Sequence, residues 1–316
     1  MKKKIKEVIL TMGLPLTYLS ALWLKFGLTR RRPQANEIIF SSLGIFPVLD
    51  HYYGPLVNPK KHLKKNLRID RILRGIDWNI DKQLDILHQF NFQEELKKIP
   101  LEKQNDTEYF YNNGMYASGD SEYLYCMVRL FKPKKIIEIG SGNSTLMAIN
   151  AIKKNELENT EYKCHHICIE PYEQPWLEKV DVELRREKVE DISLSMFSIL
   201  GENDILFIDS SHIIRPQGDV LFEILEILPS LKPGVIIHIH DIFTPKDYLN
   251  EWIFQDKKLW NEQYLLEAFL SFNTSFEIIG ATNYLSHNYR DLFEEKFPIF
   301  KSQEGREPGA FWIRRN

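Results

Sequence analysis

The chain has 316 residues, of which 43% are hydrophobic and 27% are charged, and its formal net charge is -3. These values are typical of a globular protein with a sizeable core. The slightly negative net charge gives no general attraction for nucleic acid, so we expect no nucleic-acid partner. Three cysteines without regular spacing argue against a disulfide framework or a zinc site and favour a reducing, cytoplasmic compartment.

The first segment, residues 1–33, is predicted to be an apolar N-terminal helix. Residues 8–24 carry no charge, lysines precede them, and Lys25 and an arginine cluster at 30–32 follow. The run is shorter than the roughly 20 residues of a membrane span and contains Gly13 and Pro15. Three interpretations stay open. The helix lies on the anionic inner face of a membrane, packs on its own protein or on a partner subunit of a homo-oligomer, or spans the bilayer.

The second segment, residues 34–115, is predicted to be a mostly helical accessory region that caps a pocket. Its stretch NPKKHLKKNLRIDRILRG, residues 58–75, is strongly basic and has leucine and isoleucine at helical spacing. This pattern indicates a basic helix exposed to solvent. The alternative is a contact with an anionic acceptor or with a membrane.

The third segment, residues 116–316, alternates short apolar runs with helical stretches. Such alternation predicts a Rossmann-like α/β fold: a mostly parallel seven-stranded sheet with helices on both faces and an antiparallel C-terminal strand. The expected strands are residues 134–140, 164–171, 182–189, 204–211, 234–242, 275–282 and 310–315.

Polar residues follow three of these strands at the point where each ends. The first strand runs into the turn Gly140-Ser141-Gly142, and the helix that follows is expected to be capped by the sequence NST. The second strand ends at Glu170, whose carboxylate can accept both hydroxyls of a ribose, and the fourth ends at Asp209. Because parallel strands present their carboxyl ends at one edge, these groups indicate a ligand site there.

This pattern resembles the class I S-adenosylmethionine-dependent methyltransferases, and it is similar to bacterial small-molecule and sugar O-methyltransferases. The resemblance rests on E-x-G-x-G-x-S at 138–144, Glu170 one βα unit later, DILFIDSSH at 204–212 and the C-terminal GAFWIRR, and it covers residues 116–316. It implies S-adenosylmethionine as cofactor. The residues that it assigns to the cofactor are Glu138, Gly140, Ser141, Gly142, Ser144, Glu170, Gly119, Asp120, Val189, Glu190 and Asp209.

A dinucleotide-dependent dehydrogenase is the main competing interpretation of the glycine turn. That fingerprint needs a third glycine three positions after the second and an acidic residue about 20 residues further on. Here Thr145 takes the glycine position and Glu170 lies 30 residues after Gly140, so the methyltransferase interpretation fits better.

Two strand ends carry the candidate chemistry. His212 is the candidate general base, with Asp209 and His240 as further catalytic candidates, because a hydroxyl acceptor must lose its proton. Capping of a helix or stacking on adenine are the alternatives for His212. Asp209 and Asp241, with His240 as a tentative third ligand, are the candidate metal site. Carboxylates favour Mg²⁺, whereas a histidine ligand favours Zn²⁺ or Fe²⁺.

The stretch after the fifth strand, residues 245–270, is predicted to be an amphipathic helix or a lid with Tyr248 and Trp252 as pocket walls. The leading functional hypothesis is O-methylation of a small-molecule or glycan acceptor, a sugar or a secondary metabolite. The alternatives are a metal-dependent hydroxylase or hydrolase on the same fold, and a non-catalytic module that binds the cofactor or a glycan.

Overall fold

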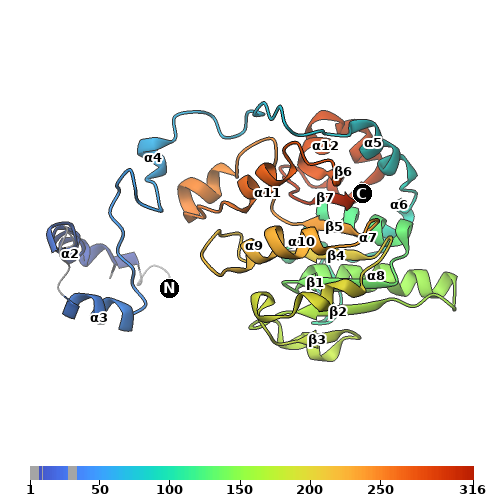
Figure 1. The fold of residues 1–316 in the computed structure, drawn as a ribbon, viewed down its shortest axis with the longest axis horizontal. Coiled ribbons are helices and arrows are strands. Elements are labelled where there is room, and N and C mark those ends of the chain that lie inside the picture. The colour runs from blue at the N-terminus through green and yellow to red at the C-terminus, as the bar shows by residue number, and fades with distance from the viewer. Residues whose placement is uncertain (1–6, 9, 28–33) are drawn as a thin grey trace. The chain divides into compact units, whose positions relative to one another are not determined.

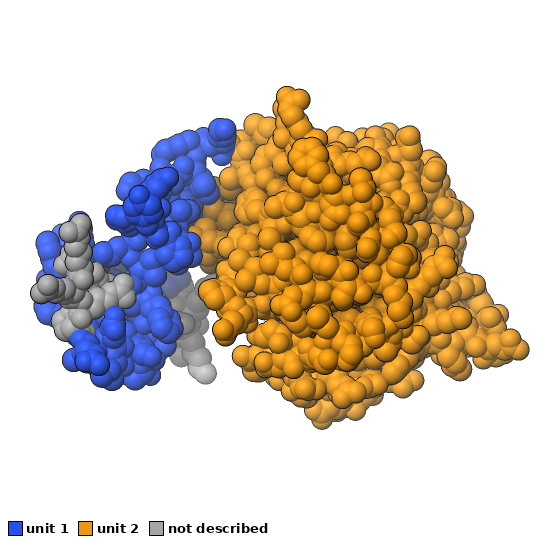
Figure 2. All heavy atoms as spheres, in the orientation of Figure 1, with its two compact units in different colours: residues 1–65 blue, residues 66–316 orange. Residues whose placement is uncertain are grey.

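The structure is a computed structural model that describes residues 7–8, 10–27 and 34–316. It divides into two compact units, residues 1–65 and residues 66–316, which Figure 2 draws in two colours. The sequence-based division at residues 33 and 115 stays a prediction, because compactness alone does not show which parts fold independently.

Among the described residues of the first unit are the helices α2 (Leu14–Gly27), α3 (Gln34–Ser42) and α4 (Pro59–His62). Large apolar side chains of α2, such as Leu16 and Trp23, are exposed. The basic residues before and after the apolar run, at 2–6 and 30–32, lie outside the described residues. Nowhere in the part of the chain that the structure describes is a helix both long and apolar enough to cross a bilayer. Peripheral membrane contact and a cytoplasmic position stay predictions. Co-sedimentation with anionic vesicles, with and without residues 1–33, would test the membrane contact.

The second unit is a seven-stranded sheet with strand order β3-β2-β1-β4-β5-β7-β6 (Figure 1). Strands β1 to β5 are parallel, and β7 is antiparallel to both β5 and β6. The expected mostly parallel sheet with an antiparallel C-terminal strand is therefore confirmed. The strands are β1 (Lys135–Ile139), β2 (His165–Ile169), β3 (Glu183–Arg185), β4 (Ile205–Ile208), β5 (Ile236–Ile239), β6 (Phe276–Ala281) and β7 (Phe311–Arg315).

Both faces of the sheet are covered, because the strand side chains alternate between two buried clusters. In β4, Ile205 and Phe207 join one cluster, and Leu206 and Ile208 join the other. The helices that supply the first cluster are α5 (Ile80–Gln89), α6 (Gln93–Leu96), η1 (Tyr111–Asn113), α7 (Asp120–Phe131), α8 (Asn143–Glu158), α12 (Thr282–Asn288), α13 (Arg290–Lys296) and α14 (Pro298–Ser302). Those that supply the second are η3 (Val189–Asp191), η4 (Leu194–Ile199), α9 (Asp219–Phe222), η5 (Glu223–Ile227), α10 (Leu228–Ser230) and α11 (Glu262–Leu270). The remaining short helical turns are η2 (Pro175–Lys179) and η6 (Trp252–Asp256).

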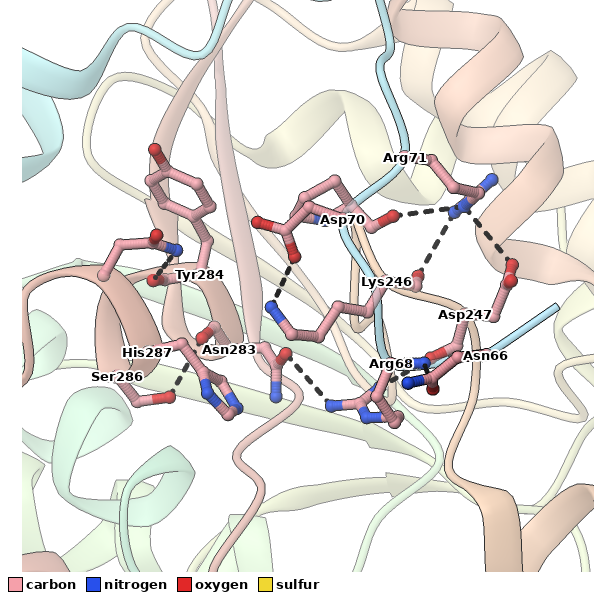
Figure 3. Close-up of polar contacts among 12 residues, drawn as sticks. Asn66, Arg68, Asp70, Arg71, Lys246, Asp247, Asn283, Tyr284, Ser286 and His287 are labelled. Carbon is pink, nitrogen blue, oxygen red and sulfur yellow. Dashed lines mark hydrogen bonds and ion pairs between the residues drawn. The ribbon is translucent and has the colours of Figure 1, made fainter.

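The basic stretch at 58–75 is not the continuous helix that its pattern predicts. Only Pro59–His62 is helical, and residues 66–72 lie along the loop that follows β5 (Figure 3). The Arg71 amide donates to the Pro245 carbonyl at 3.1 Å, and Arg68 pairs with Glu307 at 2.7 Å. Arg71 also pairs with Glu267. These carboxylates and carbonyls lie far away in sequence, so tertiary contacts override the local helical pattern.

Candidate functional site

The glycine turn after β1 is packed directly against the end of β4. Gly140 has φ +75°, and a Cβ built on it would lie 1.8 Å from the Asp209 carbonyl oxygen. Its amide donates to the Ile169 carbonyl at 3.0 Å, and the Asp209 amide donates to the Ile139 carbonyl at 2.9 Å. Only glycine combines that backbone angle with that closeness. The turn therefore joins the ends of β1, β2 and β4.

The next helix, α8, begins one residue earlier than its capping pattern predicts. Gly142 is the N-cap residue, and its amide donates to the Thr145 hydroxyl at 3.1 Å. Asn143, Ser144 and Thr145 thus form the first helical turn. A Cβ on Gly142 would meet nothing within 4 Å, so this residue faces open space. The amides of the first turn of α8 lie at the same edge of the sheet.

A buried polar network lies under the turn. The Ser144 hydroxyl donates to Glu138 at 2.6 Å, and His166 Nε2 lies 2.8 Å from the other Glu138 oxygen. Glu138 is 1% exposed and does not line either cavity described below. Ser144 is therefore a hydrogen-bond partner of Glu138, and Glu138 contacts the first turn of α8 without lining a cavity.

The His166–Glu138 pair makes the stability of the fold depend on pH. Burial alone lowers the pKa of His166, but its contacts with Cys168 and Glu138 outweigh burial and raise the pKa to about 10. A histidine with a raised folded-state pKa contributes stability that is complete below its ordinary value of 6.5 and is lost as the pH rises through 10.

We expect His166→Gln to lower the free energy of unfolding at neutral pH by about 3 kcal/mol, the cost of breaking a buried pair. The loss should shrink as the pH rises to 10, where the wild type has lost the same contribution. Urea unfolding at a series of pH values measures this. His165→Gln is the matched control, because the His165 side chain is 52% exposed. A His166→Gln deficit that does not change with pH would contradict the ion pair.

Two adjoining cavities lie at the carboxyl edge of the sheet. The β3-side cavity has a volume of about 450 Å³ and the β5-side cavity about 470 Å³. Gly140, Glu170 and Asp209 line both of them. The strand ends that the sequence singled out therefore meet in one continuous site.

Glu170 is held in place by backbone amides. One carboxylate oxygen accepts hydrogen bonds from the Tyr172 and Glu173 amides, both at 2.9 Å, and the other accepts from the Ser141 amide at 3.3 Å. These contacts tie the carboxylate after β2 to the glycine turn. Val189 and Glu190 line the β3-side cavity beyond Glu170.

The structure does not bring Gly119 and Asp120 to either cavity. The Asp120 carboxylate is buried and accepts hydrogen bonds from the Gly309 and Ala310 amides at 2.9 Å and 2.8 Å, and from the Thr282 hydroxyl at 3.0 Å. It joins α7 to the start of β7. The preceding loop, residues 114–116, lines the β5-side cavity instead.

Two carboxylates and an imidazole meet in the β5-side cavity. His212 Nε2 lies 3.3 Å from Asp209 Oδ1 and 3.7 Å from Asp241 Oδ2. Ligand atoms of these three residues all lie within 4.8 Å of one another. His240, the sequence-based candidate for the third ligand, lies beside this group, with Nε2 3.6 Å from Asp241 Oδ1.

Charges in this cluster shift the protonation of each member. Burial opposes the charged form of His212, but Asp209 and Glu262 outweigh burial and hold the pKa of His212 well above its ordinary value. Burial raises the pKa of Asp209, but His240 and His212 outweigh it and leave that pKa below the ordinary value. Burial raises the pKa of Asp241. Without a bound cation, His212 is therefore an imidazolium at neutral pH and not a ready base.

Three residues of the site have no counterpart in the sequence-based set. Glu262 Oε2 lies 2.9 Å from His212 Nδ1, and Glu262 is fully buried. Trp260 lies against the His212 ring, with centroids 4.2 Å apart, and Lys258 lines the same cavity. They lie in the stretch that the sequence predicts to be an amphipathic helix or a lid, where no local signal distinguishes them from their neighbours. Tyr248, expected as a pocket wall, is buried behind the lining, whereas Trp252 lines the cavity.

Comparison with known proteins finds similarity over the sheet. A family model described as "Methyltransferase domain" matches residues 137–242, which span the glycine turn to the end of β5. An uncharacterized protein of Archaeoglobus fulgidus is 31% identical over 173 residues, which are 51% of this chain and 76% of that protein.

Two solved structures are also similar in part. One is the O-methyltransferase from Bacillus cereus in complex with SAH, with 12% identity, a TM-score of 0.35, and coverage of 82% of this chain and 94% of that one. The other is the plantazolicin methyltransferase BpumL in complex with a pentazolic desmethylPZN analog and SAH. It has 12% identity, a TM-score of 0.39, and coverage of 75% and 99%.

Proposed function

Since the chain belongs to the class I S-adenosylmethionine-dependent methyltransferases, we propose that it methylates a hydroxyl group of a sugar or secondary-metabolite acceptor. One observation carries this proposal: the two cavities meet at Asp209, where the carboxylate–imidazole cluster begins. A hydroxyl loses its proton when it attacks a methyl group, so an O-methyltransferase benefits from proton acceptors or a cation at that position.

The cavity lining fits the cofactor. S-adenosylmethionine supplies the electrophilic methyl group when bound. Glu170 would accept the ribose hydroxyls, and Val189 and Glu190 would face the adenine. Ser141 lines the β5-side cavity, and its hydroxyl is buried without a hydrogen-bond partner in the described residues. Such a group is free to contact a polar atom of the cofactor at the glycine turn.

The same cavity has the ligands for a divalent cation. Asp209, Asp241 and His212 would hold it, and such an ion lowers the pKa of a bound hydroxyl. Two carboxylates suit Mg²⁺, and the imidazole also suits Mn²⁺ or Fe²⁺. His240 lines the cavity just outside this set. Burial lowers its pKa, but Asp241 and Asp209 outweigh burial and raise that pKa, and a cation on these two carboxylates would oppose the rise. We assign to His240 Nε2 the proton that the acceptor hydroxyl loses. The sequence-based assignment made His212 the general base and His240 the tentative metal ligand, and the present proposal exchanges these two roles.

Calorimetry with S-adenosylhomocysteine tests the cofactor site without any acceptor. We expect the wild type to bind and Gly142→Asp to lose binding by about 100-fold or more, because the new carboxylate enters the cavity where a Cβ meets no protein atom. Equal affinity of the two proteins would contradict the cofactor site. Transfer of a radiolabelled methyl group to panels of alcohols, phenols and amines tests the acceptor. Transfer of the label to amines alone would overturn the proposal of O-methylation. Turnover that is unchanged by a chelator would contradict the role of a cation.

A further inference from the structure

The wall of the β5-side cavity carries a lysine held between two tryptophans. Lys258 Nζ lies 4.4 Å from the centroid of the Trp252 ring and 4.7 Å from that of Trp260. The two rings are 5.1 Å apart and nearly perpendicular, at 72°. All three side chains line the cavity that also contains the glycine turn and Asp241. We call Trp252, Lys258 and Trp260 the lysine clamp.

The backbone fixes the clamp relative to the candidate chemistry. Trp252 begins the turn η6, and the Lys258 amide donates to the Trp252 carbonyl at 2.9 Å. The Asn261 amide donates to the His212 carbonyl at 3.1 Å, which anchors the loop beside the carboxylate–imidazole cluster. The Trp252 ring also packs edge-on against Phe243, with centroids 5.3 Å apart. The ammonium group is therefore positioned in advance of any ligand.

Within the described part of the protein, Lys258 is not engaged in an ion pair, and it acts on Asp241 only at longer range, where it opposes the rise in the pKa of that carboxyl. No carboxylate there lies within 4.0 Å of its ammonium nitrogen, whereas the neighbouring Lys257 donates to a backbone carbonyl. Apart from histidines, the charged residues lining the β5-side cavity are otherwise acidic: Glu170, Glu173, Asp209 and Asp241. A cation held on aromatic faces in such a cavity remains available to pair with an anion from outside.

We propose that the lysine clamp selects an acceptor that carries an anionic group, a carboxylate or a phosphate, close to the hydroxyl that is methylated. The two tryptophan rings hold the ammonium, the ammonium pairs with the anion, and the hydroxyl is directed to Asp209 and Asp241. This inference rests on the proposed O-methyltransferase function and names its acceptor class. The four carboxylates disfavour an anion along much of the remaining lining, so that, apart from the two histidines, Lys258 is the cationic side chain of this cavity that can receive it.

Probe binding tests the clamp on the full chain saturated with S-adenosylhomocysteine. The probes are D-glucuronate for the carboxylate, D-glucose 6-phosphate for the phosphate and D-glucose as the neutral match. Tryptophan fluorescence and calorimetry measure the binding of each probe. We expect saturable binding of at least one anionic probe, at least about tenfold weaker in Lys258→Met and partly restored in Lys258→Arg. Lys257→Met, the matched control, should bind as the wild type does.

Other results would overturn the proposal. These are no binding of either anionic probe, equal binding of D-glucose, or anion binding that survives Lys258→Met. Binding of tetramethylammonium gained in Lys258→Met would also overturn it, because the lysine would then only fill an aromatic cage meant for a cationic acceptor. The affinity for S-adenosylhomocysteine is measured in parallel. If the wild type does not bind S-adenosylhomocysteine, the proposed function fails, and the result says nothing about the clamp.

Discussion

Gly140→Ala is expected to abolish binding of S-adenosylhomocysteine and to lower the free energy of unfolding by at least about 3 kcal/mol. Two physical effects add up. Alanine at φ +75° costs about 1 kcal/mol, and its Cβ would lie 1.8 Å from the Asp209 carbonyl oxygen, which is backbone and cannot rotate away. The ends of β1 and β4 must then separate. That movement displaces both Asp209 and the amides of the turn, so binding and stability fall together.

Gly142→Ala is the matched control, two residues further along the same turn. Gly142 has φ -170°, an extended angle that alanine adopts, and the added Cβ meets no atom within 4 Å. We expect its unfolding free energy to stay within about 1 kcal/mol of the wild type. Urea unfolding and calorimetry measure both variants. If Gly140→Ala were as stable as Gly142→Ala, the close packing of the turn against β4 would be wrong.

The sheet and the cofactor side of the site could be predicted because their signals are local. Each strand is a short apolar run, and Gly140, Glu170 and Asp209 immediately follow their strands. The parallel order then brings them to one edge without any knowledge of side-chain contacts. Local sequence signals are therefore sufficient to predict the class of fold and the position of the ligand site.

The catalytic side could not be predicted to the same depth, because its contacts join distant segments. Glu262 reaches His212 across 50 positions. The resemblance assigns Asp120 to the cofactor, yet its carboxylate accepts hydrogen bonds from the backbone amides of residues 309 and 310. A sequence pattern indicates that a polar residue is present, but only the packing shows whether it faces the cavity or the core.

The backbone after the strand ends determines that His212, and not His240, is the third member of the carboxylate–imidazole cluster. Strand alternation groups His240 with His238 and separates it from Asp241, but it says nothing about the loop that carries His212. His212 and Asp241 both have positive φ, 59° and 57°, so both strands turn sharply where they end. These turns bring the His212 and Asp241 side chains together and leave His240 beside them.

The second large effect is expected for Glu262→Gln, which should lower kcat about 10- to 100-fold while leaving the affinity for S-adenosylhomocysteine unchanged. Glu262 contacts no cavity but holds His212 Nδ1 at 2.9 Å, and this contact directs Nε2 toward Asp209 and Asp241. Glu262 is thus a positioning residue. Glutamine keeps the size of the side chain and removes the charge that favours this orientation.

The matched control lies on the same helix. Glu267 is also largely buried, but its partners are Arg71 and the Thr244 hydroxyl, away from the cluster. Glu267→Gln should lower the free energy of unfolding without changing kcat or the affinity for Mn²⁺ in a calorimetric titration. Glu262→Gln should weaken Mn²⁺ binding about tenfold or more together with the loss of kcat. If the two variants lose stability alike and both keep full turnover, Glu262 is a structural residue only. If Glu262→Gln loses turnover but keeps its Mn²⁺ affinity, the charge of Glu262 acts on His212 as a proton carrier and not as a cation ligand.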